Sequence, residues 1–106
     1  MIWMATYLSK EGGAMNDILK QIDNVLNDLG FEAVEINGNK LYYNKNKRSY
    51  YKFTFIEDFR AYVIESASNY EEAKNNLFED GDLFSIDVDE KEFDEKLRDD
   101  LIKYYC

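Results

Sequence analysis

The stretch of residues 79–95, EDGDLFSIDVDEKEFDE, contains nine carboxylates and a single lysine. Clustered carboxylates can bind Ca²⁺, act as general acids and bases, or attract a basic partner. Its Asp-Gly-Asp phrase resembles the start of an EF-hand calcium loop. When the loop is counted from Asp80, Phe84 stands where an oxygen ligand is needed. Ser85 replaces the required glycine, and Lys91 replaces the final glutamate. The sequence therefore predicts no dedicated metal site.

Other catalytic signatures are missing as well. The 106 residues include no histidine and only one cysteine, Cys106, so the usual neutral-pH base and a thiolate pair are absent. No glycine-rich phosphate loop and no nucleophile motif occurs. These observations predict a protein that is not an enzyme and that carries no cofactor and no metal.

The charge is distributed unevenly along the chain. The formal net charge is −9, yet residues 36–56 hold five basic residues and no acidic one. A net negative field argues against binding nucleic acid through its phosphates. The basic band KLYYNKNKRSYYKF nevertheless interleaves Lys and Arg with tyrosines that could stack on single-stranded RNA bases. The alternative is structural, because tyrosine favours strands and lysine protects their edges.

The first half of the chain predicts a helix followed by strands. Apolar residues recur at helical spacing before Gly30, which suits the position after a helix end, and Asn16 can cap the start. This apolar stripe comprises Ile18, Leu19, Ile22, Val25, Leu26 and Leu29. Asn37-Gly38 then predicts a tight hairpin with Val34 opposite Leu41.

The rest of the sheet and the end of the chain follow from the same patterns. Residues 49–56 and 59–65 predict two further strands, with Tyr51, Phe53 and Phe55 on one face. Residues 68–78 and 89–105 predict two helices, which the pairs Ser68/Glu71 and Asp89/Glu92 could cap. The stripe of the last helix comprises Phe93, Leu97, Leu101 and Tyr104.

The predicted fold is therefore a single α+β domain over residues 15–106. It has an N-terminal helix, a four-stranded antiparallel meander and two C-terminal helices, in the order α-β-β-β-β-α-α, with the helices on one sheet face. Residues 1–14 form either a translated leader before a native start at Met15 or an N-terminal arm. The side of the sheet that the helices leave open is a candidate second interface, and we expect Tyr42, Tyr50, Tyr62 and Ile64 to line it.

The acidic stretch has two explanations. Carboxylates from Asp87 onward precede or open the last helix, where they stabilise its free N–H groups. Glu79, Asp80 and Asp82 are left over, in a segment expected to be a loop between two helices. Together with Phe84 and Asp87, they are the candidate partner-binding residues: charge steers the encounter and the apolar side chain anchors it. The alternative buries Phe84 and leaves the acids solvated.

The run YVIESASNYEEAKNNLFEDGDLFSIDVDEKEFDEKLRDDLIKYY also resembles small acidic immunity proteins of bacterial polymorphic-toxin and contact-dependent growth inhibition systems. The resemblance lies in the order of elements and in the phrase NYEEAKNNLFEDGDLF, over roughly residues 42–105. It implies a protein that binds its cognate toxin C-terminal domain one to one, through a basic surface of that domain, and blocks its active site. A nuclease is one candidate for this toxin.

Two further functions stay open beside it. One is an acidic interaction or regulatory module, including a DNA mimic that occupies a nucleic-acid-binding protein. The weaker one is a single-stranded RNA binder that uses the tyrosine-lysine band. The lone cysteine, the absence of an apolar run of about 20 residues and the lack of a basic segment at the start predict a cytoplasmic protein that does not enter a membrane.

Overall fold

The computed structural model describes residues 17–106 of the chain, so the predictions for residues 1–14 and for a cap at Asn16 lie outside the described residues. In chain order the elements are a first helix over residues 17–28, β1 (Glu32–Ile36), β2 (Asn39–Asn44), β3 (Ser49–Ile56), the 3-10 turn η1 (Glu57–Phe59), β4 (Ala61–Ala67), α2 (Tyr70–Lys74), β5 (Glu79–Ser85), α3 (Glu90–Asp100) and the π-helical turn η2 (Leu101–Tyr105). The strands form one antiparallel sheet in the order β1-β2-β3-β4-β5.

The α+β class and the first four strands are confirmed, but the predicted element order is wrong in one place. Residues 79–85 form the edge strand β5, paired with β4, rather than a loop between two helices. Acidic residues and glycine are uncommon in strands. Because this segment contains both, its sequence lacks the clear alternation of apolar and polar residues that predicts a strand. At the edge of a sheet, however, charged residues are favoured because they discourage unwanted pairing with other chains.

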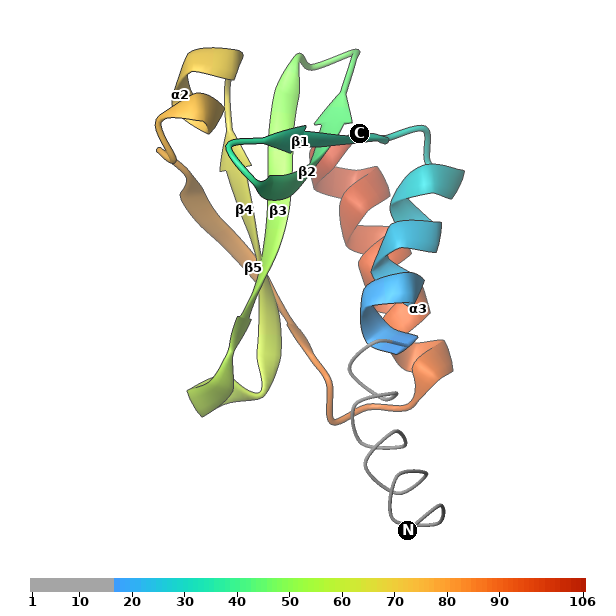
Figure 1. The fold of residues 1–106 in the computed structure, drawn as a ribbon. Coiled ribbons are helices and arrows are strands. Elements are labelled where there is room, and N and C mark those ends of the chain that lie inside the picture. The colour runs from blue at the N-terminus through green and yellow to red at the C-terminus, as the bar shows by residue number, and fades with distance from the viewer. Residues whose placement is uncertain (1–16) are drawn as a thin grey trace, which may run out of the picture.

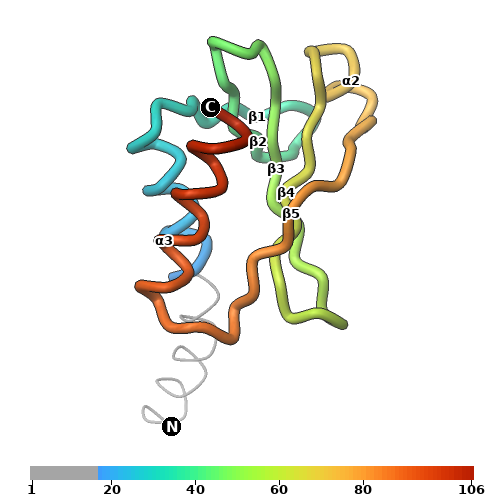
Figure 2. The backbone as a smooth tube through the Cα atoms, turned by 180° about the vertical axis from the view of Figure 1, so that it is seen from behind, coloured from blue at the N-terminus to red at the C-terminus, as the bar shows by residue number. Residues whose placement is uncertain are grey.

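The two long helices pack on one face of the sheet and lie side by side in both views (Figures 1 and 2). The larger core lies between them and the sheet. It contains the buried residues Ile22, Val25, Leu26, Phe31, Tyr42, Tyr51, Tyr62, Ile64, Phe84, Phe93, Leu97 and Leu101. Leu19, predicted to belong to this core, is instead about half exposed.

The end of the first helix follows the expected glycine pattern. Gly30 has a φ of +89°, a left-handed conformation that glycine adopts without strain. Its N–H donates to the carbonyl of Asn27 at 3.1 Å, and Phe31 N–H donates to Leu26 at 2.9 Å. This bonding pattern is the Schellman motif, and it turns the chain from the helix into β1.

The β1–β2 hairpin has the predicted register. Asn37 and Gly38 have φ values of +53° and +82°, as a type I′ turn requires. Val34 lies opposite Leu41, and Glu35 lies opposite Lys40. The hairpin tip is tied to α2, since the Asn37 side chain donates to the Lys74 carbonyl at 2.8 Å.

The second face of the sheet differs from the prediction. Tyr42 and Tyr62 pair with Tyr51 and Phe55 across neighbouring strands, so they share the helix-covered face with them and are buried. Ile64 is buried there as well. Only Tyr50, of the four residues expected on the open side, lies on the opposite face.

That opposite face is partly covered by α2. A small second core holds Leu41, Ala67 and Ala73, with Tyr50 and Phe78 packed against it. The prediction that all helices lie on one face of the sheet is therefore wrong. Because α2 has only five residues, it covers one end of this face.

Two helix details also differ. The cap of α2 is Asn69, not Ser68: its side chain accepts from the Glu72 N–H at 2.9 Å, and Glu72 accepts in turn from the Ser68 N–H at 2.8 Å. In the last segment, the wider turn of η2 changes the phase of the helix. As a result Tyr105 packs against the core, while Tyr104 is exposed.

None of the helices within residues 17–106 is long and apolar enough to cross a membrane.

Candidate functional site

The predicted partner-binding residues lie on and just beyond the edge strand β5, but they do not all face outward. Glu79 and Asp80 are exposed, and Asp82 is half-buried. Phe84 is only 1% exposed and belongs to the core, so it cannot serve as the apolar contact. The structure therefore corrects the prediction for Phe84, because the strand periodicity turns this side chain toward the helices.

Asp87 follows β5 and is occupied locally. Both of its carboxylate oxygens accept from Nε of Arg60 at 3.0 Å. The pair joins the end of β5 to the turn before β4, where Ile86 N–H also donates to the Arg60 carbonyl at 3.0 Å. These bonds fix the direction in which the chain leaves the sheet. Since both side chains remain more than half exposed, the ion pair itself contributes little stability.

A β-bulge divides β5 into two parts. Val63 pairs with Leu83 and Glu65 with Asp80, so Ile64 on β4 faces two residues of β5, Gly81 and Asp82. The bulge separates an acidic half of the strand from an apolar half. It also increases the local twist, which is one way of protecting a sheet edge.

Tyr105 supports the bulge from the helix side. A Cβ built on Gly81 would overlap the Tyr105 hydroxyl oxygen and lie 3.1 Å from Cγ2 of Ile64. Burial raises the pKa of the Tyr105 phenol; a hydrogen bond from the backbone of Asp82 opposes this, and the nearby carboxylates of Asp82 and Asp100 raise it further. Asp82 of β5 and Asp100 at the end of α3 thus both lie near the Tyr105 phenol.

An open groove of about 590 Å³ lies between the apolar half of β5 and α3. Its apolar lining comprises Phe59, Ala61, Leu83, Phe84, Val88 and Phe93. Leu83 is 44% exposed and Phe59 is 66% exposed, so a partner can reach these side chains. We call this feature the β5 groove.

The rim of the β5 groove is acidic. It comprises Glu92, Glu95, Lys96, Asp99 and Asp100. Lys96 is the single base: its Nζ lies 3.3 Å from Asp100 and 5.6 Å from the centre of the Phe84 ring. Four carboxylates against one ammonium give the groove a net negative rim around an apolar floor. This combination fits a partner with apolar and basic side chains.

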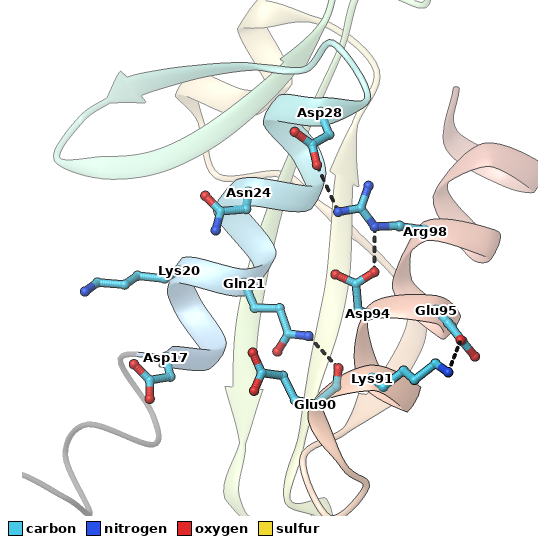
Figure 3. Close-up of a pocket in the computed structure, with 10 residues that line it drawn as sticks. All are labelled: Asp17, Lys20, Gln21, Asn24, Asp28, Glu90, Lys91, Asp94, Glu95 and Arg98. Carbon is cyan, nitrogen blue, oxygen red and sulfur yellow. Dashed lines mark hydrogen bonds and ion pairs between the residues drawn. The ribbon is translucent and has the colours of Figure 1, made fainter.

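A second hollow lies between the first helix and α3, and its lining is polar (Figure 3). Contacts between the two helices cross it: Gln21 donates to the Glu90 carbonyl at 2.6 Å, and Arg98 bridges Asp28 at 2.9 Å and Asp94 at 2.6 Å. Three of its lining side chains, those of Gln21, Asp28 and Arg98, thus hold the two helices together. We therefore assign this hollow a structural role.

No three His, Cys, Asp or Glu side chains within residues 17–106 are arranged to hold a metal ion.

The tyrosine-lysine band is split between the two faces of the sheet. Tyr42 and Tyr51 are buried under the helices, whereas the rings of Tyr43 and Tyr50 pack 4.7 Å apart on the other face. Lys45, Lys47 and Arg48 are exposed in the turn between β2 and β3. Half of the tyrosines proposed for base stacking are thus inaccessible to a nucleic acid.

Sequence reasoning missed the apolar residues of the β5 groove, above all Leu83 and Phe59. The sequence pattern predicts a loop for Asp82-Leu83-Phe84-Ser85, and a loop gives its side chains no defined direction. Read as a strand, it places Leu83 and Phe84 on opposite faces. The apolar half of β5 was therefore the signal that could have revealed the groove.

Comparisons with protein-family models, with curated protein sequences and with solved structures find no match to this chain.

Proposed function

We propose that this protein is a bacterial immunity protein. It binds a cognate toxin domain one to one, covers the active site of that domain and performs no catalysis of its own. The observation that carries the proposal is the β5 groove, where an apolar floor is bordered by carboxylates of α3, while the exposed acids Glu79 and Asp80 lie farther along the same strand, outside the groove lining.

The charge distribution supports a basic partner. Glu79 and Asp80 are exposed at the edge of the sheet, and Glu92 and Asp99 on the groove rim form no ion pair with any residue in the described part of the chain. Such carboxylates can pair with Lys or Arg of a partner without breaking an internal ion pair. A nuclease active site is a suitable target, because an enzyme that binds the phosphate backbone of a nucleic acid needs a basic substrate groove.

The geometry favours this function over single-stranded RNA binding. The RNA hypothesis needs a continuous row of accessible tyrosines, and the sheet buries Tyr42 and Tyr51. It also needs a positive field, whereas the formal net charge is −9. A DNA-mimicking protein would share the acidic surface but would not need the apolar floor.

A growth-protection assay tests the proposal. The C-terminal domain encoded by the gene immediately upstream is expressed in bacterial cells, with and without this protein. The domain alone should stop growth, and co-expression should restore it. If the domain is toxic and co-expression restores no growth, the immunity function is wrong.

A further inference from the structure

The proposed function assigns no role to the free edge of β5. In the sheet order β1-β2-β3-β4-β5, this strand has a hydrogen-bonded neighbour on one side only. Half of its backbone N–H and C=O groups therefore point away from β4. Such an edge can accept another strand.

The lining of the groove places it beside the apolar half of β5. Leu83 and Phe84 are consecutive residues of a strand, so their side chains point to opposite faces of the sheet. Both nevertheless line the same groove. The groove therefore lies beside this part of β5, a strand that has a neighbour in the sheet on one side only.

We infer that the partner docks by adding a strand to β5. This inference rests on the proposed function, and it specifies how the toxin domain is held. The incoming segment is extended, carries Lys or Arg opposite Glu79 and Asp80, and places an apolar side chain in the β5 groove beside Leu83. Backbone hydrogen bonds attach the incoming segment to the edge of β5. The side chains determine which segments bind.

Charge complementarity selects this occupant. Opposite charges on paired strands stabilise a sheet, and like charges directly opposite one another destabilise it. The carboxylates of Glu79 and Asp80 therefore favour a basic strand and disfavour an acidic one. A second copy of β5 contains no Lys or Arg to pair with these carboxylates, so it is a poorer match for this edge than a basic strand.

The other edge of the sheet makes a useful comparison. β1 carries Glu32 and Glu35, both exposed, so it is also acidic. Its hairpin tip, however, is tied to α2 through Asn37. None of its residues lines the β5 groove. Strand addition is therefore assigned to β5, and β1 serves as the internal control.

Hydrogen exchange of the complex tests the inference. The probe is the toxin domain encoded by the upstream gene, added in excess to the intact protein. Among Glu79–Ser85, the amides that point away from β4 should exchange at least about tenfold more slowly in the complex, since these amides gain hydrogen-bond partners. Amides of Glu32–Ile36 should be unaffected.

A pair of matched variants provides the second readout. Leu83→Lys places a charge in the β5 groove, and it should weaken binding at least about tenfold, as the loss of a central apolar contact does. Leu77→Lys makes the same change at a leucine that is 60% exposed and does not line the groove. It should change the affinity less than about twofold.

The outcomes separate the docking mode from the function. If the complex forms without added protection in β5, or if Leu83→Lys binds as tightly as Leu77→Lys, strand addition is wrong and the immunity function stands. If a toxic domain forms no complex at all, the proposed function fails and the docking mode fails with it.

Discussion

The hydroxyl of Tyr105 lies against Gly81, in the space that the Cβ of any other residue would occupy. The contact joins the end of the last helical segment to the bulge of the edge strand. It explains why a glycine stands within a strand, where glycine is otherwise unfavourable.

Gly81→Ala should therefore destabilise the protein by about 1–3 kcal/mol, the usual cost of adding a methyl group to a packed site. Adding Tyr105→Phe should recover part of this loss, because it removes the overlapping oxygen. The recovery should be incomplete, since Cγ2 of Ile64 lies 3.1 Å from the same position. Urea unfolding of the single and double variants measures both effects, and additive losses would contradict the proposed contact.

Asp89 provides a second stability test. Its side chain accepts from the Glu92 N–H at 2.8 Å and caps α3, as the sequence predicted. Asp89→Ala should lower the free energy of unfolding by about 1 kcal/mol through loss of the cap. Partner affinity should stay nearly unchanged, because Asp89 does not line the β5 groove. Unfolding and binding curves for one preparation give both values, and a large loss of affinity would move Asp89 into the interface.

The pH dependence of stability should include a contribution from Asp23. This carboxylate accepts from Nζ of Lys40 at 2.7 Å and from the Tyr42 hydroxyl at 3.2 Å, and the bond to Lys40 lowers its pKa below the ordinary 3.8. A carboxylate whose pKa is lower in the folded state adds stability at pH values above its unfolded-state pKa. This stability is lost as the pH falls through the pKa of the folded state.

The variant Asp23→Asn measures this contribution. Since the Asp23 side chain is 43% exposed, the destabilisation near neutral pH should be small, about 0.5 kcal/mol. The difference between wild type and variant should shrink as the pH is lowered below about 3.8. Denaturant unfolding at several pH values tests this expectation, and a difference that grows on acidification would contradict it.

The acids of β5 should control the rate of association. Neutralising them together, as Glu79→Gln, Asp80→Asn and Asp82→Asn, should slow binding to the toxin domain and reduce its dependence on salt. The free energy of unfolding should change by less than about 0.5 kcal/mol if these charges are exposed steering groups. Stopped-flow mixing at two salt concentrations measures the rates.

A second triple variant controls for net charge. Glu32→Gln, Glu35→Gln and Glu71→Gln remove the same number of charges at exposed positions outside β5 and its groove. This variant should retain a faster association and a steeper salt dependence than the β5 triple. Equal rates for the two would mean that only total charge matters.

The hairpin shows what the sequence could predict. Asn37-Gly38 specifies one turn type, and the turn fixes the register of Val34 and Leu41. The turn of residues 45–48 has no such signature. The pairing of Tyr42 with Tyr51 was therefore not predictable, and neither was the face to which Tyr42 points.

The candidate site shows where sequence reasoning stopped. The role of Asp89 was predictable, because a cap depends on residues close in sequence. The position of Leu83 depends on its pairing with Val63, which is distant in sequence. The acidic residues of β5 also weaken the sequence pattern that would predict a strand there. Helix capping does not explain Glu79, Asp80 and Asp82, because they lie in β5, and the groove farther along this strand depends on the tertiary structure.

An inhibition titration tests whether the protein blocks the active site of the toxin domain stoichiometrically. The catalytic activity of the purified toxin domain is measured as this protein is added at concentrations well above the dissociation constant. The activity should fall linearly and reach zero at one equivalent. Full activity in the presence of a several-fold excess, or a bound complex that still turns over substrate, would contradict it.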